Sequence, residues 1–182
     1  TESDEISLLF RPEWDLFDRE VEKIVSLSAG IASATFALAC GQMVHFDSRI
    51  WMGVDKEQVI DYFRWRQEDA GRCALNGWCH WTLLKEGKTP AEAMAILQGK
   101  SLPFKMELLS QYGIDFDSLP LWQRRGTGLY WEQYEKAGFD PIRNIEVTAT
   151  RRRLMIDEEL PAKETYGAFI RNILNMHSIQ EL

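Results

Sequence analysis

Residues 61–70, Asp-Tyr-Phe-Arg-Trp-Arg-Gln-Glu-Asp-Ala, decide how the rest of the chain is interpreted. They fall inside a segment that we expect to form one long helix, because Asp55 is a favourable N-cap and Gly87 is a favourable residue just past a helix end. The expected helix runs from Glu57 to Lys85. Strands and shorter helices are expected on both sides of it, so the fold class follows from their order.

Alternation of apolar residues, caps and helix breakers predict the other elements. Ile6, Leu8 and Phe10 alternate with their neighbours before Arg11-Pro12, which predicts a strand. We expect strands at residues 6–10, 44–51, 127–135 and 145–156. We expect further helices at residues 16–40 (capped by Asp15), 90–98, 102–112 and 162–175, an irregular segment at 114–126 and a turn at 138–144. Strands that flank a helical insertion predict an α+β fold with a largely antiparallel sheet.

Length and composition describe a chain that can build a hydrophobic core. The 182 residues are 45% hydrophobic and 27% charged, which excludes a disordered or collagen-like protein. The net charge of −7 argues against a simple basic nucleic-acid-binding module. Residues 1–22 hold eight acids and two bases, so this stretch accounts for −6 of that charge. Arginines in the nearly neutral remainder can therefore still gather into a phosphate-binding surface.

The cysteines and one uncharged segment bear on the compartment. Cys40, Cys73 and Cys79 are too few for a disulfide framework and favour a reducing cytoplasm. Cys73, Cys79 and His80 lack a second pair of ligands, so a zinc site is disfavoured. Residues 24–44 carry no charge over the length of a membrane span, but they are rich in serine, alanine and glycine and carry a helical stripe of larger residues. We expect a buried core helix there and no membrane span.

The acidic start of the chain is a candidate metal site. Ser3, Asp4 and Glu5 lie at the mouth of the expected strand 6–10, and two adjacent carboxylates there suit Mg²⁺, an ion that aligns phosphates for in-line displacement. An acidic surface turn is the other explanation. Side chains alternate along a strand, so Asp4 and Glu5 point to opposite faces and the pattern leaves open which carboxylate faces the site.

Basic residues after the acidic stretch form a second candidate group. They could line a phosphate-binding surface, or each could pair with a nearby acid such as Asp61 or Glu68. For an arginine taken singly, the second explanation is favoured. Arg152 points away from Arg151 and Arg153, because the three lie on an expected strand. The group consists of Arg64, Arg66, Lys105, Arg124, Arg125 and Arg151–Arg153.

Four segments together resemble the tRNA-His guanylyltransferase family, whose members are 3′-to-5′ polymerases. Residues 61–70 resemble the family's RWRQ-x-D-A signature, and residues 3–7, Ser-Asp-Glu-Ile-Ser, resemble its SDE metal strand. Residues 46–49, Phe-Asp-Ser-Arg, resemble its FD-x-R strand. Residues 104–114, which include Phe-Lys-Met-Glu-Leu-Leu and Tyr-Gly-Ile, resemble its KNE segment. The four matches occur in the family's order, and the resemblance covers the chain from residue 3 to about residue 126.

The resemblance implies a polymerase-palm-like (ferredoxin-like) antiparallel sheet with a helical fingers-like insertion, the first strands lying upstream of this chain. It assigns residues 1–54 to the palm, 55–126 to the helical block, and 127–182 to strands and a helix that complete the sheet. It implies a cytoplasmic nucleotidyltransferase that adds nucleotides, GTP preferred, to the 5′ end of tRNA with two Mg²⁺ ions, after activation by ATP or another nucleoside triphosphate. It also implies a homo-oligomer, a tetramer by resemblance.

The same resemblance assigns roles to individual residues. Asp4 is expected to be a catalytic metal ligand, with Glu5 as a catalytic residue and Ser3 as a nucleotide contact beside it. Lys105 is expected to meet a triphosphate, and Lys23 and Arg19 are further phosphate candidates, because cations neutralise charge on a transferring phosphoryl group. The family's other metal aspartate belongs to a DGR-x-F segment upstream of this chain, so half of the metal site is expected here.

Two departures from the family pattern leave alternatives open. Residues 71–77, Gly-Arg-Cys-Ala-Leu-Asn-Gly, stand where eukaryotic members carry HINNLYN, and Met106 replaces the asparagine after Lys105. These changes weaken strict tRNA-His guanylylation and favour the bacterial and archaeal-type branch, whose members resemble 5′-end repair enzymes. The altered segment at residues 71–77 also motivates a non-catalytic RNA-binding or assembly domain derived from a palm fold. A nucleotide cyclase, which also uses a palm with paired carboxylates, is a third alternative, but its usual glycine-rich motif does not appear.

Overall fold

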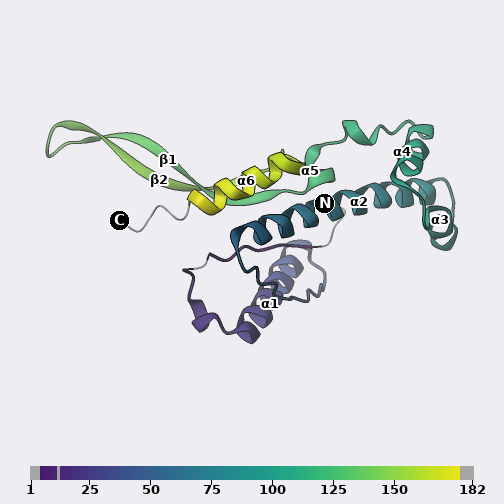
Figure 1. The fold of residues 1–182 in the computed structure, drawn as a ribbon, viewed down its shortest axis with the longest axis horizontal. Coiled ribbons are helices and arrows are strands. Elements are labelled where there is room, and N and C mark those ends of the chain that lie inside the picture. The colour runs from purple at the N-terminus through teal and green to yellow at the C-terminus, as the bar shows by residue number, and fades with distance from the viewer. Residues whose placement is uncertain (1–4, 12, 177–182) are drawn as a thin grey trace. The chain divides into compact units, whose positions relative to one another are not determined.

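The computed structural model describes residues 5–11 and 13–176, which form two compact units (Figure 1). The larger unit holds the chain from Ile60 onward together with Glu5 and Ile6. The smaller unit holds Ser7–Val59. Helices dominate both units, and the described part of the chain contains one antiparallel sheet of two strands. The expected α+β class is confirmed.

Helix α2, Lys56–Lys85, is the long helix that the sequence predicts. Its start is capped by Asp55, whose Oδ1 accepts a hydrogen bond of 2.9 Å from the Gln58 backbone N–H. Its end is closed by Gly87 at φ +86°, a conformation that glycine adopts without steric cost. The Lys88 N–H donates back to the Leu83 carbonyl at 3.1 Å, which completes a Schellman motif.

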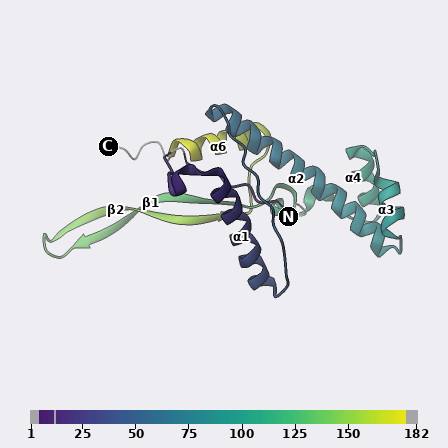
Figure 2. The same ribbon diagram turned by 90° about the horizontal axis from the view of Figure 1, so that it is seen from below.

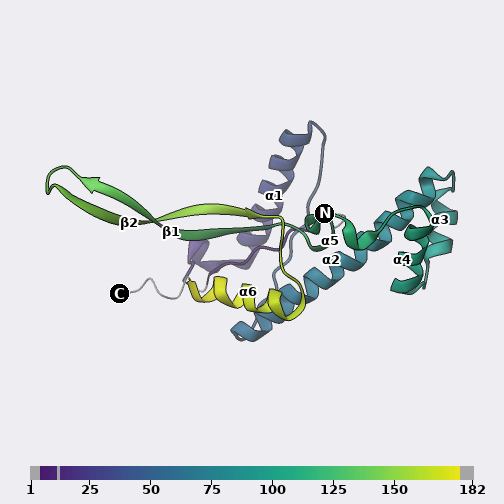
Figure 3. The same ribbon diagram turned by 90° about the horizontal axis from the view of Figure 1, so that it is seen from above.

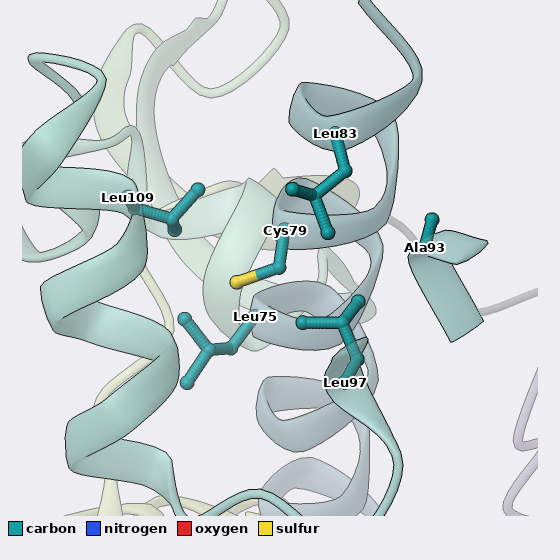
Figure 4. Close-up of a cluster of buried hydrophobic side chains, with 6 residues drawn as sticks. All are labelled: Leu75, Cys79, Leu83, Ala93, Leu97 and Leu109. Carbon is teal, nitrogen blue, oxygen red and sulfur yellow. The ribbon is translucent and has the colours of Figure 1, made fainter. Parts of the chain in front are cut away.

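Helices α3, Pro90–Leu97, and α4, Leu102–Gln111, pack on the C-terminal half of α2. Thr89 and Glu92 form a capping box at the start of α3, as the Thr-Pro-x-Glu sequence predicts. Figure 4 shows Cys79 pointing from α2 toward the helix that carries Leu109. The buried cluster consists of Leu75, Cys79, Leu83, Ala93, Leu97 and Leu109. The first three lie four residues apart on α2, so one helix face builds half of this core.

The segment after α4 leads into a long β-hairpin. The segment expected to be irregular, 114–126, contains two short helices, η2 at Phe116–Ser118 and α5 at Leu121–Arg125. Strands β1, Gly128–Asp140, and β2, Ile145–Asp157, then pair antiparallel along their full length. Figure 3 shows this hairpin as an extended two-stranded ribbon. Strand β1 is longer than the predicted 127–135, because pairing continues to Asp140, within the predicted turn at 138–144. Strand β2 agrees with the predicted 145–156 to within one residue.

Helix α6, Lys163–Met176, covers one face of the hairpin base and the N-terminal half of α2. The Phe169 ring meets Tyr130 of β1 edge to face at 5.2 Å between centroids. A second buried cluster consists of Ile60, Leu160, Tyr166 and Ile170. Burial raises the pKa of Tyr166 to about 12, so this phenol stays protonated inside the cluster. The two hydrophobic clusters lie on different halves of α2, so this helix contributes to both cores of the larger unit.

The predicted strands at residues 6–10 and 44–51 are wrong. Residues 5–11 and 43–53 have no regular secondary structure. A strand needs a partner for its backbone groups, and within the described residues β1 and β2 pair with each other and with no third strand. The second segment instead hydrogen-bonds to helix side chains: the Phe46 N–H donates to Ser33 Oγ at 2.8 Å. The palm sheet implied by the family resemblance therefore stays a prediction, as does the three-part division of the chain.

The predicted helix at residues 16–40 is broken at its start. A 3-10 turn, η1 at Leu16–Arg19, precedes α1 at Val21–Cys40, because residues 17–19 have positive φ angles between 51° and 59°. Asp15 makes no capping hydrogen bond from its side chain, contrary to the prediction. Gly41 ends α1 at φ +67°, as predicted.

Helix α1 is also not the buried core helix that its composition predicts. It has no buried residue, and Ile31 and Leu38 are 64% and 86% exposed. The described residues of its own unit, 7–11 and 13–59, form no sheet or second long helix that covers it. Figure 2 shows the following segment of chain running back alongside the helix. By length and composition alone, α1 could cross a membrane, with a mean hydropathy of 1.5.

Candidate active site

Glu5 is the member of the acidic Ser-Asp-Glu stretch that the structure describes; Ser3 and Asp4 lie outside the described residues. The Glu5 carboxylate forms an ion pair with Arg66 on α2. Arg66 also reaches Asp69, with 3.3 Å between Nη1 and Oδ2. Its guanidinium lies 4.6 Å from the centroid of the Trp65 ring, within the range of a cation–π contact. The chain segment that carries the expected metal ligand is thus joined to the RWRQ stretch.

Alternating charges continue beyond this pair. Asp69 receives a second arginine, since Arg72 Nη2 lies 3.0 Å from its Oδ1. Only 16% of the Arg66 side chain is exposed, whereas Arg72 is 53% exposed. Loss of either carboxylate next to a mostly buried arginine leaves its charge poorly compensated, which is costly. The Glu5–Arg66–Asp69 contact is therefore the part of this row of charges that is most sensitive to removal of a partner. The outer pair to Arg72 is close to solvent and contributes little.

Lys105, the expected triphosphate contact, lies against a different part of α2. Its Nζ donates to Asn76 Oδ1 at 2.8 Å, and its carbonyl accepts a hydrogen bond from the Cys79 thiol at 3.3 Å. Burial raises the pKa of Cys79 to about 11 although Lys105 opposes this, so the thiol stays protonated at neutral pH. Asn76 and Arg66 are ten residues apart on one helix, a separation of about 15 Å along its axis. The structure therefore does not bring Lys105 next to Glu5.

The other two phosphate candidates lie in the smaller unit, and each has local partners. Lys23 Nζ lies 2.7 Å from Glu20 in the first turn of α1. The Arg19 guanidinium donates to the Arg11 and Trp14 carbonyls at 3.3 and 3.1 Å. These contacts hold the Arg19 side chain against the loop that precedes η1. Both assignments stay predictions.

Ordinary pairing, the favoured explanation for single arginines, is confirmed for several members of the basic group. Arg64 lies 3.5 Å from Asp61, and Arg124 lies 3.2 Å from Asp117. Arg153 binds Glu132 on the paired strand through two nitrogens, at 2.7 and 2.6 Å. The strand register also places Arg152 on the face opposite to Arg153, as predicted.

The RWRQ stretch has a structural role that the sequence does not reveal. Gln67 Nε2 donates to the Pro161 carbonyl at 2.9 Å, and Arg125 donates to the neighbouring Leu160 carbonyl at 3.0 Å. Arg64 passes directly under Gly167 of α6, where a Cβ would lie 3.1 Å from the Arg64 Cδ. Gln67 and Arg64 thus hold the chain from Pro161 to Gly167 against α2, and Arg125 ties Leu160 to α5. Pro161 lies 94 residues downstream of Gln67, and Leu160 lies 35 residues downstream of Arg125, so no local pattern could have indicated these contacts.

Metal ligands and open pockets do not add a second candidate site. Within residues 5–11 and 13–176, no three His, Cys, Asp or Glu side chains gather closely enough to hold a metal ion. The Glu5 carboxylate faces an arginine, so the described residues do not make up a Mg²⁺ site by themselves. An open pocket of about 450 Å³ lies at the C-terminal end of α2, and Trp81 and Tyr112 are among the residues that line it. None of the described candidate residues lines it.

Comparisons with known proteins agree with the resemblance of the motifs. The family described as tRNAHis guanylyltransferase matches residues 1–59, and the family described as Thg1 C terminal domain matches residues 57–166. The chain is 33% identical to tRNA(His) guanylyltransferase 1 of Arabidopsis thaliana over 70% of this chain and 24% of that relative. It is 30% identical to a probable tRNA(His) guanylyltransferase of Dictyostelium discoideum over 86% of this chain and 64% of the relative.

A relative from Debaryomyces hansenii, also a tRNA(His) guanylyltransferase, is 30% identical over 86% of this chain and 65% of its own length. The chain thus spans about a quarter of the plant relative and about two thirds of the other two. All three relatives are eukaryotic, so the expected bacterial and archaeal-type branch stays a prediction. The two family matches follow each other without a gap and cover the chain from residue 1 to residue 166. The chain belongs to the tRNA-His guanylyltransferase family.

Proposed function

We propose that the protein containing this chain is a nucleotidyltransferase that adds nucleotides to the 5′ end of tRNA in the 3′-to-5′ direction. The observation that carries the proposal is the pair of consecutive family matches over residues 1–59 and 57–166. The substrates proposed are tRNA and a nucleoside triphosphate, with GTP preferred for addition and ATP or another triphosphate for activation. The reaction product is either guanylylated tRNA-His or a repaired tRNA 5′ end.

Residue roles in this proposal follow the motifs. Asp4 is proposed as a Mg²⁺ ligand, with Ser3 beside it. Binding of Mg²⁺ is assigned to Asp4 and not to Glu5, because Glu5 is paired with Arg66. Lys105 is proposed to bind a phosphate of the triphosphate. Within the described part of the chain, its ammonium donates to Asn76, and an ammonium carries three donors, so a phosphate oxygen can be bound without breaking that contact. Lys23 and Arg19 are proposed as weaker phosphate contacts from the smaller unit.

Labelled nucleotide transfer tests the proposal. The whole protein is incubated with Mg²⁺, labelled GTP and either tRNA-His or a tRNA lacking its first nucleotide, and the label at the 5′ end is counted. Asp4→Ala is expected to lower incorporation by about 100-fold or more, since losing a metal ligand removes charge stabilisation at the phosphoryl group. Glu22→Gln, which neutralises another acid of the same N-terminal stretch, is the matched control and is expected to match the wild type. Equal incorporation by Asp4→Ala and wild type contradicts the assignment.

The altered segment Gly71–Gly77 is the reason to propose a second candidate function, that of a non-catalytic RNA-binding or assembly domain. In the structure, Ala74 and Leu75 of this segment are buried, and Asn76 is hydrogen-bonded to Lys105. The segment thus has a packing role here. Binding of tRNA by the whole protein without any nucleotide incorporation establishes this alternative and refutes the enzyme. Incorporation opposite a template base in truncated tRNA, without addition to tRNA-His, assigns the repair branch.

Compartment and assembly complete the proposal. A reducing cytoplasm suits the three cysteines, which are free in the structure. A homotetramer is proposed from the family resemblance, and light scattering of the whole protein at several concentrations measures it directly. A mass of one or two chains at all concentrations contradicts the tetramer.

A further inference from the structure

We propose that Arg66 is a positioning residue that anchors the acidic N-terminal segment to α2 through Glu5, and that Glu5 is this anchor point and not a catalytic carboxylate. The inference concerns the same site as the proposed enzymatic function and rests on that function for its catalytic consequence. It assigns different tasks to Asp4 and Glu5, whose roles the sequence pattern leaves open.

The first support is the environment of Arg66. This side chain is mostly buried and contacts two carboxylates, Glu5 and Asp69, on different nitrogens of one guanidinium. Its Nε is buried and has no hydrogen-bond partner. A buried guanidinium with an unsatisfied nitrogen is costly, so the two carboxylates and the Trp65 ring are the interactions that hold it in place. Removal of Glu5 leaves Asp69 as the acid partner of the arginine among the described residues.

The second support is the division of the chain. Glu5 and Ile6 group with the larger unit, while the residues that follow them in sequence, from Ser7 onward, group with the smaller one. Residues 5–11 have no regular secondary structure, so no strand pairing holds Glu5 against α2. Among the ion pairs of the described residues, the contact with Arg66 is the one that joins the segment before residue 7 to α2. The anchor is therefore a side-chain contact.

The third support is the chemistry of the carboxylate itself. A carboxylate that accepts from a buried guanidinium is oriented by it and has its charge neutralised by it. Such a group is a poor ligand for a second cation, which has to compete with the arginine. Groups that orient an adjacent ligand commonly change metal affinity or activity by about 10- to 100-fold when mutated. We expect an effect of this size for Arg66 and for Glu5 alike, through the orientation of the chain at the preceding residue.

Limited proteolysis of the whole protein tests the anchor without any reaction. Chymotryptic cleavage after Leu8, Leu9 or Phe10 is expected to be faster in Arg66→Gln and in Glu5→Gln, because a released segment enters the protease more easily. The double variant is expected to be cleaved no faster than either single one, because both substitutions remove one interaction. Arg143→Gln is the matched control, since Arg143 is an exposed arginine paired with Asp140 near the turn between β1 and β2. Unchanged cleavage in Arg66→Gln, or strictly additive effects of the two substitutions, overturns the proposal.

Nucleotide addition supplies the second readout. Arg66→Gln and Glu5→Gln are expected to lower kcat by a similar factor of about 10 to 100, to be non-additive, and to leave the KM for the nucleoside triphosphate within about twofold. Arg66→Lys, which keeps a charge, is expected to recover part of the loss. A large loss in Glu5→Gln beside a normal Arg66→Gln makes Glu5 catalytic and overturns the proposal. If the wild type adds no nucleotide, the proposed function fails, and the proteolysis experiment still decides whether Arg66 anchors the segment.

Discussion

Gly167→Ala tests the close approach of α6 to α2. Gly167 lies inside α6, where alanine is normally favoured over glycine by about 0.5–1 kcal/mol because glycine loses more backbone entropy on folding. A Cβ at this position lies 3.1 Å from Arg64 Cδ and 3.4 Å from Ile60 Cγ2. The first distance is shorter than an ordinary contact, so Arg64 has to shift by a few tenths of an ångström. Overpacking of this kind costs about 1–3 kcal/mol, which exceeds the gain.

We therefore expect Gly167→Ala to lower the stability of the α2–α6 contact by up to about 2 kcal/mol. Gly30→Ala is the matched control, because Gly30 also lies inside a helix, α1, and a Cβ there meets nothing within 4 Å. This control is expected to stabilise its helix by about 0.5–1 kcal/mol. Native-state hydrogen exchange with denaturant measures the stability of the two helices separately, because they belong to different units.

The contact itself can be isolated with a third variant. In an Arg64→Ala background the obstructing side chain is gone, so Gly167→Ala is expected to become neutral or stabilising there. The change of sign between the two backgrounds identifies Arg64 as the cause. Protection of α6 that rises in Gly167→Ala as much as protection of α1 rises in Gly30→Ala would refute the close approach of Arg64 to α6.

Three further outcomes follow from the helical block. Leu109→Ala is expected to cost about 3–5 kcal/mol in denaturant unfolding, because Leu109 is fully buried, whereas Leu38→Ala, at an exposed position, is expected to change stability by less than about 0.5 kcal/mol; similar losses for both contradict the core. Thr89→Ala is expected to cost about 1 kcal/mol through the lost N-cap of α3. Thr89→Ser keeps both the acceptor for the Glu92 N–H and the hydroxyl that donates to the Glu92 carboxylate, so it is expected to retain most of that stability; an equal loss in both points away from capping. In thiol labelling of the native protein, Cys73 is expected to react and Cys79 to resist, and rapid labelling of Cys79 contradicts its burial. The stability of the protein is expected to fall as the pH rises from about 9 toward 11, because the Cys79 thiol keeps its proton in the folded state and releases it in the unfolded state.

Local signals in the sequence predicted the helices of the larger unit well. Asp55, Thr89, Gly87 and Gly113 act within a few residues of their own positions, and caps of this kind do not depend on distant partners. The hairpin was also within reach, because both strands pair across a short turn. What the sequence predicted correctly is therefore what neighbouring residues decide among themselves.

The smaller unit shows why the remainder could not be predicted. Alternation at Ile6–Phe10 is a valid strand signal, but a strand forms only when another backbone completes its hydrogen bonds. The apolar stripe of α1 is likewise a valid signal for burial, but burial requires a surface to pack on, and the described residues of the smaller unit leave every α1 side chain at least partly exposed. The break at residues 17–19 depends on positive φ angles that the residue types at Phe17 and Asp18 do not predict.

The candidate site combines both kinds of information. Motif order alone pointed to Glu5 and to residues 61–70 as parts of one enzyme, without indicating that they touch. The structure makes Arg66 their point of contact and turns Gln67 and Arg64 toward the chain near α6. A stretch that fastens two distant segments to one helix must keep its residue types for geometric reasons as well as for chemistry. Variants of residues 61–70 that lose activity therefore need a measurement of segment order, such as the proteolytic cleavage of residues 8–10, before any of these side chains is assigned to the reaction itself.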